Sequence, residues 1–305
     1  MAGGNTVTAQ EHWTRKGAVK LFLWEKFQVE PVSTRGTILF VHGSSMASQP
    51  TFDLQVPGRP HSSVMDYFAG LGFDCWCVDM EGYGRSDKNR PINCDIANGA
   101  DDLATASDYI AKTRHGRPLL VYGISSGALR AALFAERHPD RVARLALDAM
   151  VWTGEGSPTL AERAKRLPEY RARNRRPIDR AFVHSIFTRD HPGTADQTVI
   201  DAFADAILAL DDSVPTGTYV DMCAKLPVCD PVKITAPTLI MRGEYDGIAS
   251  MEDLLAFFAA LPSPDKEFAV MPGIAHASFQ QTNHLIAYHI LLDFFTRPAP
   301  VYRGS

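Results

Sequence analysis

The sequence PLLVYGISSGALRAALFAERH, residues 118–138, joins a short apolar run to an Ala-rich helical pattern through the pentapeptide Gly123-Ile124-Ser125-Ser126-Gly127. A Gly-x-Ser-x-Gly sequence between a strand and a helix is typical of a turn that holds its central serine in a strained backbone conformation. Small flanking residues leave room for this turn, and the central hydroxyl projects at the start of the helix. The pattern therefore predicts that Ser125 is a nucleophile.

Other short apolar runs alternate with helical patterns on both sides of this unit. The runs cover residues 36–41, 73–79, 144–148, 236–242 and 266–271, and the helical patterns cover residues 101–112 and 127–138. Near-continuous apolar runs are typical of buried parallel strands. We also expect residues 18–30 to form an antiparallel hairpin strand at the sheet edge. The alternation predicts an α/β fold with a mostly parallel central sheet flanked by helices.

Residues 151–230 break this alternation, because they are helical and polar and offer no convincing buried strand. We interpret them as a helical cap inserted into a core that residues 1–150 and 231–305 form. The chain has 305 residues and a hydrophobic content of 45%. Its composition is therefore ordinary for a globular protein with a sizeable core.

Charge and segment composition exclude several classes of partner. The net charge of −4 supplies no basic field that would attract phosphate backbones, so we expect no nucleic acid partner. The first residues contain no apolar signal segment, and no stretch approaches ~18 uninterrupted apolar residues. We therefore expect a cytoplasmic protein without a membrane partner. The five cysteines match no disulfide framework or zinc site, which predicts reduced thiols without a metal or redox role.

Two residues elsewhere in the chain are suited to activate the serine. A serine hydroxyl is a weak nucleophile unless a histidine takes its proton and an acid orients that histidine. Asp246 follows the run 236–242, and His276 follows the run 266–271. Both residues are expected at the carboxyl ends of parallel strands, where open α/β sheets bind their ligands.

Two further motifs complete a resemblance to the α/β-hydrolase fold superfamily that extends over about residues 36–295. His42-Gly43-Ser44-Ser45 resembles the HG-x-x loop that follows the third strand of that family. Asp79-Met-Glu-Gly-Tyr-Gly-Arg-Ser86 resembles its D-x-x-G-x-G-x-S turn, which says nothing about substrate.

The resemblance implies a role for each of five residues. Ser125 would be the nucleophile, His276 the base and Asp246 the acid. The backbone N–H groups of Ser44 and Ser126 would form the oxyanion hole. The resemblance implies neither a metal ion nor an organic cofactor.

Each assignment has a competitor. Asp148 ends the run 144–148, where some members of the family carry the acid. Glu244 lies near Asp246, but the family pattern G-x-x-D selects Asp246. His284 belongs to a helical pattern that we expect to pack against the sheet, and His42 is expected to organise the backbone of the oxyanion loop.

The resemblance implies two-step acyl transfer through an acyl-enzyme. Ser125 argues against epoxide hydrolases and dehalogenases, which resemble the chain but carry Asp at this position. We favour a small or medium carboxylic ester as the small-molecule substrate. One alternative is an enzyme that hydrolyses an amide, a lactone or a C–C bond with the same three residues. The other alternative is a ligand-binding protein of the same fold that has no catalytic activity. The sequence leaves open whether the chain forms a homo-oligomer.

Two segments could shape the substrate pocket. Residues 161–180 are rich in arginine, and acidic residues follow them in the cap. The simpler interpretation is that these charges face the solvent, or that the basic and acidic parts attract each other. The alternative is that one of the arginines binds a carboxylate of the substrate. The long segment after Gly43 either forms a pocket wall, with Phe52 or Leu54 as its apolar surface, or is a surface Ω-loop.

Overall fold

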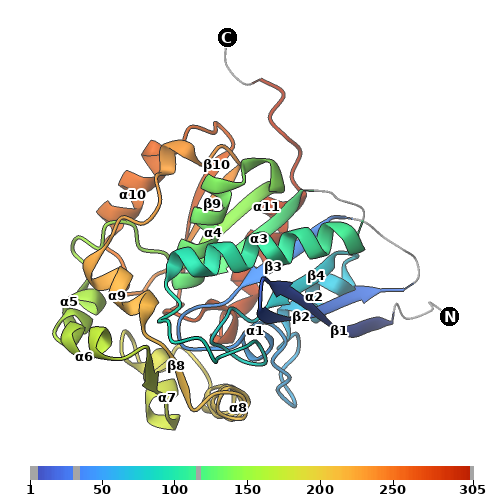
Figure 1. Cartoon of the computed structure of the whole chain (residues 1–305). Helices are drawn as coiled ribbons and strands as arrows, with labels where there is room; N and C mark the ends of the chain where they lie inside the picture. The colour runs from blue at the N-terminus through green and yellow to red at the C-terminus, as the bar shows by residue number, and fades with distance from the viewer. Residues whose placement is uncertain (1–5, 30–34, 115–117, 303–305) are drawn as a thin grey trace.

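A central eight-stranded sheet organises the chain in the computed structural model, which describes residues 6–29, 35–114 and 118–302 (Figure 1). The strand order is β1-β2-β4-β3-β5-β6-β9-β10. Six neighbouring strands are parallel, while β2 runs antiparallel to both of its neighbours, β1 and β4. The strands are β1 Val7–Lys16, β2 Val19–Gln28, β3 Thr37–Val41, β4 Asp74–Val78, β5 Leu119–Ile124, β6 Val142–Asp148, β9 Thr238–Gly243 and β10 Lys266–Met271. The predicted α/β fold class is confirmed.

The antiparallel edge of the sheet differs from the prediction. Residues 19–28 form β2, but β2 lies between β1 and β4, and β1 occupies the edge. The sequence gives no apolar alternation for β1, because only His12 is buried along this strand. Glu30, the last residue of the predicted strand, lies outside the described residues.

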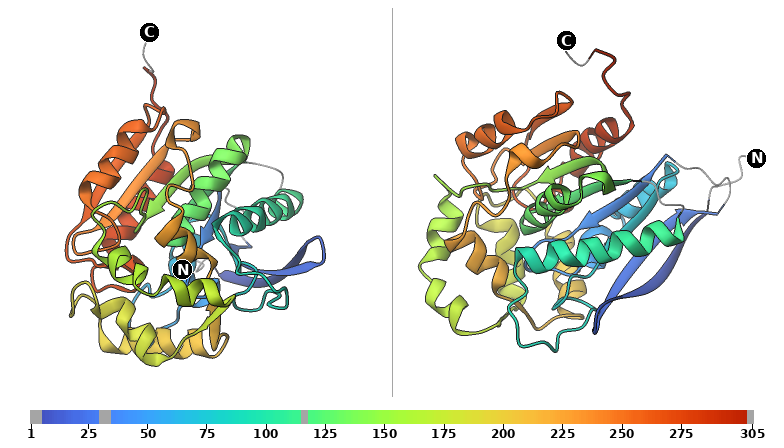
Figure 2. Two further views of the ribbon diagram at one scale, coloured as in Figure 1. Left: turned by 60° about the vertical axis from the view of Figure 1, so that its left-hand side comes forward. Right: turned by 45° about the horizontal axis from the view of Figure 1, so that its top comes forward.

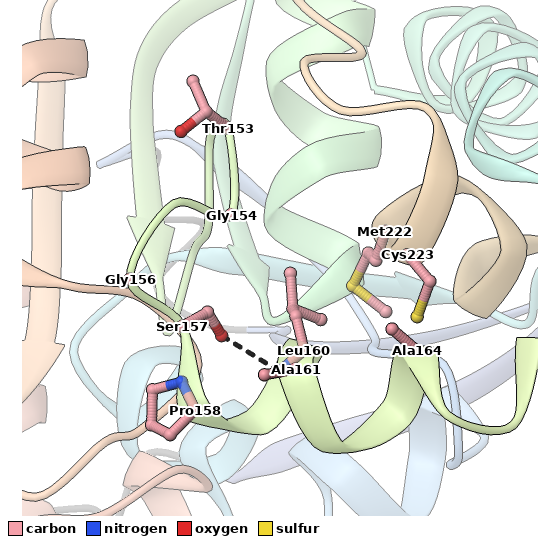
Figure 3. Close-up of a pocket in the computed structure, with 10 residues that line it drawn as sticks. All are labelled: Thr153, Gly154, Gly156, Ser157, Pro158, Leu160, Ala161, Ala164, Met222 and Cys223. Carbon is pink, nitrogen blue, oxygen red and sulfur yellow. Dashed lines mark hydrogen bonds between the residues drawn. The ribbon is translucent and has the colours of Figure 1, made fainter.

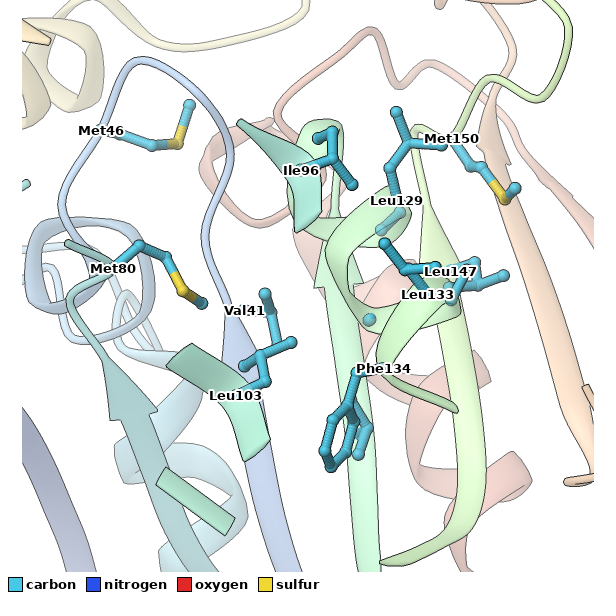
Figure 4. Close-up of a cluster of buried hydrophobic side chains, with 14 of the residues drawn as sticks. Val41, Met46, Met80, Ile96, Leu103, Leu129, Leu133, Phe134, Leu147 and Met150 are labelled. Carbon is cyan, nitrogen blue, oxygen red and sulfur yellow. The ribbon is translucent and has the colours of Figure 1, made fainter. Parts of the chain in front are cut away.

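Helices cover both faces of the sheet and enclose two apolar clusters. One cluster contains Val41, Leu103 and Phe134, which Figure 4 shows side by side with other members. The other contains Cys75 and Cys77, whose alternation in β4 puts both thiols on the same face. The helices outside residues 151–230 are α1 Ser48–Phe52, α2 Val64–Gly70, α3 Ile96–Thr113, α4 Ser126–Arg137, α10 Met251–Ala260 and α11 His284–Thr296, with short 3₁₀ turns at Pro139–Arg141, Pro231–Lys233 and Ser278–Gln280.

Residues 151–230, the inserted segment, lie between β6 and β9. They contain α5 Pro158–Ala164, α6 Leu167–Ala172, α7 Arg180–Thr188, α8 Gln197–Leu208, α9 Gly217–Ala224 and the strands β7 Arg175–Pro177 and β8 Ser213–Pro215. The sequence shows no convincing buried strand here, but β7 and β8, which are partly buried, pair as a separate antiparallel sheet. Strands of three residues are too short to show an apolar alternation. Figures 1 and 2 show the inserted segment at one end of the molecule, away from the C-terminus.

In the long connection after β3, the part around Phe52 is not a surface loop, and Phe52 is not a pocket wall. Phe52 is fully buried in α1 and contacts Phe40, Tyr122 and Phe279 in the core. Leu54 is also buried. The Ω-loop interpretation is therefore wrong for this part of the segment, and Phe52 supports the sheet.

All five cysteines are free thiols. Burial raises the pKa of Cys75 and Cys77 well above the usual range. None of the helices in the described part of the chain is both long and apolar enough to cross a membrane.

Two glycines allow α4 to start directly against the sheet. A Cβ atom at Gly127 would lie 2.3 Å from the carbonyl oxygen of Val41 and 2.5 Å from that of His42. A Cβ atom at Gly123 would lie 2.5 Å from the carbonyl oxygen of Gly127. These neighbours are backbone atoms, which cannot move aside without displacing the helix or the sheet.

We therefore expect Gly127→Ala to lower the free energy of unfolding by at least about 2 kcal/mol, because overpacking outweighs the higher helix propensity of alanine. Urea denaturation measures this change. Gly70→Ala is the matched control, because a Cβ at this glycine of α2 would meet nothing within 4 Å. Equal stability of the two variants would contradict the proposed steric limit.

Candidate active site

Ser125 occupies the turn between β5 and α4 with φ 57° and ψ −127°. A positive φ is rare for a residue with a Cβ atom, and the two flanking glycines leave the room that it requires. The side chain is nearly covered, with 6% of its surface exposed. The backbone N–H of Ser125 donates to the carbonyl oxygen of Asp148 at 2.9 Å, which ties the turn to β6.

The structure brings Ser125, His276 and Asp246 into one hydrogen-bonded chain. The distance from His276 Nε2 to Ser125 Oγ is 3.0 Å. On the other side of the ring, Nδ1 lies 3.0 and 3.1 Å from the two carboxylate oxygens of Asp246. In the arrangement that satisfies both contacts, the Ser125 hydroxyl donates to Nε2 and the Nδ1–H donates to Asp246.

The surroundings of Asp246 favour its ionised form. Burial by itself would raise the pKa of this carboxyl group, but the charge and hydrogen bond of His276 hold it below its usual range. The backbone N–H of Ile248 also donates to Asp246 Oδ1, at 3.0 Å. Arg189 of the inserted segment lowers the pKa further.

The competing acid, Asp148, has a different partner. It lies at the end of β6 and accepts a hydrogen bond from the Tyr122 hydroxyl at 2.6 Å. Burial raises the pKa of Asp148 to about 7, and the nearby charge of Asp246 acts in the same direction. Asp246, rather than Asp148, is therefore the carboxylate that faces His276.

The two other competitors lie outside this chain of hydrogen bonds. Glu244 accepts from the backbone N–H of Gly273 at 2.8 Å, which connects the loops after β9 and β10. His284 begins α11 and packs its ring against Tyr288. Burial lowers the pKa of His284.

The loop of His42-Gly43-Ser44-Ser45 lies against the serine turn. A Cβ atom at Gly43 would lie 3.3 Å from the Cβ of Ser125. In the described part of the chain, the backbone N–H groups of Ser44 and Ser126 donate to no protein acceptor. Both groups are thus available to a ligand near Ser125.

His42 organises the backbone of this loop. Its Nε2 accepts from the Met80 N–H at 3.0 Å, and its Nδ1–H donates to the Gly43 carbonyl oxygen at 2.7 Å. Burial and the charge of Arg130 lower the pKa of His42 to about 3. The ring is therefore neutral, as both hydrogen bonds require.

Arg130 of α4 is a supporting residue that the sequence analysis missed. Its Nη1 donates to the His42 carbonyl oxygen at 3.0 Å, and its side chain is 1% exposed. A Cβ atom at Gly99 would lie 2.6 Å from Arg130 Cδ, so this glycine of α3 makes room for the guanidinium stem. The signal in the sequence is a charged residue within the otherwise apolar stretch 128–135 of α4.

The inserted segment reaches the same loop through Arg176 of β7. Arg176 Nη2 donates to Ser45 Oγ at 2.6 Å. Ser45 Oγ also lies 3.4 Å from the Tyr219 hydroxyl of α9. Burial would raise the pKa of Tyr219, but the charges of Arg163 and Arg176 lower it to about 7.

Two of the cavities in the inserted segment have residues of α5 in their walls. One, of about 500 Å³, lies between α5 and α9, where Leu160 and Ala164 face Met222 and Cys223 (Figure 3). Burial raises the pKa of Cys223, so this cavity contains no activated thiol. The other, of about 620 Å³, lies beside the loop that carries Asp246.

Asp190, Asp246 and His276 are close enough to be considered as metal ligands, because one ligand atom of each lies within 4.8 Å of the others. Both ring nitrogens of His276 already contact Asp246 and Ser125, however. The Asp190 carboxylate pairs with Arg189 at 3.3 Å. A metal ion would have to break one of these contacts, so the donor set fits hydrogen bonding better than metal binding.

The sheet topology and the serine turn define an α/β hydrolase. Residues 33–283 match the family model described as serine aminopeptidase, S33, and the chain belongs to this family. The predicted membership of the α/β-hydrolase fold superfamily is thereby confirmed, and the chain is an enzyme of this class.

Solved structures with the same fold include three hydrolases. A soluble variant of monoglyceride lipase from Saccharomyces cerevisiae in complex with a substrate analogue has a TM-score of 0.71 and 17% identity over 96% of each chain. E-2-(acetamidomethylene)succinate hydrolase has a TM-score of 0.70 and 19% identity over 95% of this chain and 100% of that chain. A thermophilic esterase from Thermogutta terrifontis has a TM-score of 0.67 and 19% identity over 94% of this chain and 100% of its own. At these identities the comparison shows the fold.

The raised pKa of Asp148 predicts how its replacement changes stability with pH. The native carboxyl group, with a pKa of about 7, keeps a proton that the unfolded chain releases near pH ~4. The contribution of Asp148 to stability therefore falls as the pH rises through this window. Asp148→Asn removes the titration and keeps an oxygen for Tyr122, so its stability relative to wild type should rise by at least about 1 kcal/mol between pH ~5 and ~8.

Urea unfolding at each pH measures this difference. Glu169→Gln is the control, because the hydrogen bond with Arg166 lowers the pKa of Glu169 and this residue does not act on Asp148. Its carboxylate is ionised in both the folded and the unfolded state over most of this range, so its difference from wild type should stay flat. A flat difference for Asp148→Asn as well would contradict the prediction.

Proposed function

We propose that the protein is a serine hydrolase that cleaves a small or medium carboxylic ester through an acyl-enzyme. The hydrogen-bonded chain Ser125–His276–Asp246 supports this proposal most directly. Its three members come from the carboxyl ends of β5, β10 and β9, and all three are buried. A buried base that already contacts the nucleophile does not need to move before reaction.

The reaction follows from the position of each group. Ser125 Oγ forms a bond to the ester carbonyl carbon while its proton passes to His276 Nε2. The negative charge that develops on the carbonyl oxygen faces the N–H groups of Ser44 and Ser126. His276 then gives its proton to the departing alkoxide, which leaves as an alcohol. A water molecule attacks the acyl-enzyme, again through His276, and releases the carboxylic acid and Ser125.

An ester is favoured because an alcohol leaving group makes the smallest demand on the acid His276. The names of two solved relatives, a monoglyceride lipase and an esterase, also denote ester hydrolases. Amide, lactone and C–C bond hydrolysis need the same three residues, and a substrate panel separates them from ester hydrolysis. A non-catalytic ligand-binding protein is the alternative that nucleophile labelling tests.

The proposal includes the inserted segment as a cap over the catalytic residues, with residues 1–150 and 231–305 as the core. The contact between Arg176 and Ser45 supports this division, because it joins the inserted segment to the loop beside Ser125. We also propose a cytoplasmic location and a small-molecule substrate, without a nucleic acid or membrane partner. The free thiols support a reducing compartment.

A fluorophosphonate probe should label the wild-type protein at Ser125, because the contact with His276 activates its hydroxyl. Ser125→Ala should lose this labelling and at least about a thousandfold in kcat. Ser107→Ala, which removes a buried hydroxyl from α3, is the matched control and should be labelled like wild type. Labelling is measured by intact-protein mass, and a panel of esters, lactones, thioesters and amides follows on the unlabelled enzyme.

Absence of labelling in folded wild-type protein would overturn the catalytic proposal and favour the binding protein. Labelling without ester turnover, but with turnover of an amide or a lactone, would keep Ser125 as the nucleophile and replace the substrate class.

Ester hydrolysis should also lose rate as the solution becomes more acidic. A protonated imidazole cannot accept the Ser125 proton, so kcat/KM for a methyl ester falls when His276 gains a proton. Initial rates across the acidic range measure this loss, with circular dichroism to confirm that the protein stays folded. A rate that is unchanged well below about pH 5 would contradict a histidine base.

A further inference from the structure

The cavity of about 620 Å³ in the inserted segment adjoins the proposed catalytic residues. Tyr245 and Gly247, the neighbours of Asp246, form part of its wall. Asp190 also lines it, and an oxygen of this carboxylate lies within 4.8 Å of ligand atoms of Asp246 and His276. Its size is within the range of small-molecule sites.

Most charged groups around this cavity have a partner of opposite charge. Arg166 pairs with Glu169 at 2.8 Å, Arg189 pairs with Asp190 at 3.3 Å, and Glu162 pairs with Lys165. These pairs leave no excess of negative charge on the cavity wall.

Two arginines have no such partner in the described part of the chain: Arg163, which lines the cavity, and Arg176, which does not line it but stacks on the lining residue Tyr219. Among the described residues, no carboxylate lies within 4.0 Å of either guanidinium group. Arg176 is 8% exposed, and Arg163 lines the cavity. Arg163 Nη1 and Arg176 Nε are both buried without a hydrogen-bond partner. A buried donor on a charged group costs free energy unless an acceptor reaches it.

One tyrosine ring holds the two guanidinium groups together. Arg163 Cζ lies 4.4 Å and Arg176 Cζ lies 4.2 Å from the ring centroid of Tyr219. Phe182 stacks on Arg176 from another side, at 4.6 Å. Stacking on aromatic faces fixes the planes of the guanidinium groups and leaves N–H groups at their edges for a ligand.

The surroundings of this pair favour negative charge. The two arginines lower the pKa of Tyr219 to about 7 against the effect of its burial. Arg189 contributes to the same field. The phenol of Tyr219 can offset part of this positive charge, and a bound anion would offset it more fully.

Other arginines of the inserted segment do have carboxylate partners. Arg180 of α7 pairs with Asp205 and lies 3.7 Å from Asp201, both on α8, and His184 lies 3.1 Å from Asp201. Attraction between the basic and acidic halves therefore explains Arg180. It does not explain Arg163 and Arg176.

We propose that Arg163 and Arg176 bind a carboxylate group of the substrate, so that the preferred substrates are esters that carry a second, free carboxylate. This inference rests on the proposed ester hydrolysis. A guanidinium fork matches a carboxylate through two parallel N–H donors. Because Arg176 also donates to Ser45, next to Ser44, the bound carboxylate lies on the oxyanion side of the reacting ester.

The test compares monomethyl esters of dicarboxylic acids with methyl esters of monocarboxylic acids of the same chain length. For the wild type, we expect kcat/KM to favour the anionic ester by at least about tenfold. Arg163→Gln and Arg176→Gln should each reduce this preference by at least about tenfold. Arg163→Lys keeps the charge without the planar fork, so it should retain part of the preference.

Arg171→Gln is the matched control, because it removes the same charge from an exposed position of α6, outside the cavity. Its preference should equal that of the wild type. Thermal melts establish that each variant is folded. An equal response of anionic and neutral esters to Arg163→Gln and Arg176→Gln, or a wild-type enzyme without preference, would overturn the inference while ester turnover and Ser125 labelling kept the proposed function.

Direct titration with a dicarboxylate, adipate, provides a readout that needs no turnover. Adipate should bind the wild type and lose at least about tenfold in affinity in Arg163→Gln, with Arg171→Gln unchanged. If labelling and turnover both failed but this binding pattern held, the proposed function would fall and the anion site would stand. Absence of adipate binding, or tighter binding of inorganic phosphate at the same arginines, would overturn the carboxylate assignment.

Discussion

The close approach of α4 to the end of β3 determines where the proposed reacting groups lie. Only a glycine fits at position 127, because a side chain there would meet the carbonyl oxygens of Val41 and His42. This contact places the start of α4, the loop after β3 and the strained Ser125 turn in one rigid unit. The proposed nucleophile and the N–H groups proposed to receive the oxyanion therefore have fixed relative positions before any ligand binds.

Electrostatic surroundings separate two carboxyl groups that both end strands near Ser125. His276 faces Asp246 and lowers its pKa, whereas Asp148 faces a phenol and the charge of Asp246, which leaves burial to raise its pKa to about 7. Only one of them can carry a permanent charge at low cost, and that one orients the histidine. Electrostatic surroundings also set the state of His42. Burial and the charge of Arg130 lower its pKa, so the ring stays neutral and can hold the backbone of its loop.

The sequence predicts the parts of the fold that repeat a local pattern. The apolar runs 36–41, 118–123 and 266–271 each correspond to a parallel strand, since buried strands must be apolar throughout. The sequence does not predict β1, because this edge strand has only one buried residue. It does not predict β7 and β8, because they are too short to show an alternation of apolar and polar residues. The sequence predicts Ser125 from its Gly-x-Ser-x-Gly turn, and Asp246 and His276 from their positions after strands. Arg130 acts through tertiary contacts, which motif spacing does not reveal.

The arginines of the inserted segment show why composition could not decide between a solvated face and a binding site. Arg180 and Arg163 look alike in the sequence, and only the folded chain shows that one has carboxylate partners and the other has none among the described residues. A guanidinium group with a buried, unpaired nitrogen and no carboxylate partner opposes folding. Two such groups on one tyrosine ring, beside the proposed catalytic residues, are therefore better explained by a ligand that brings the missing charge than by a contribution to stability.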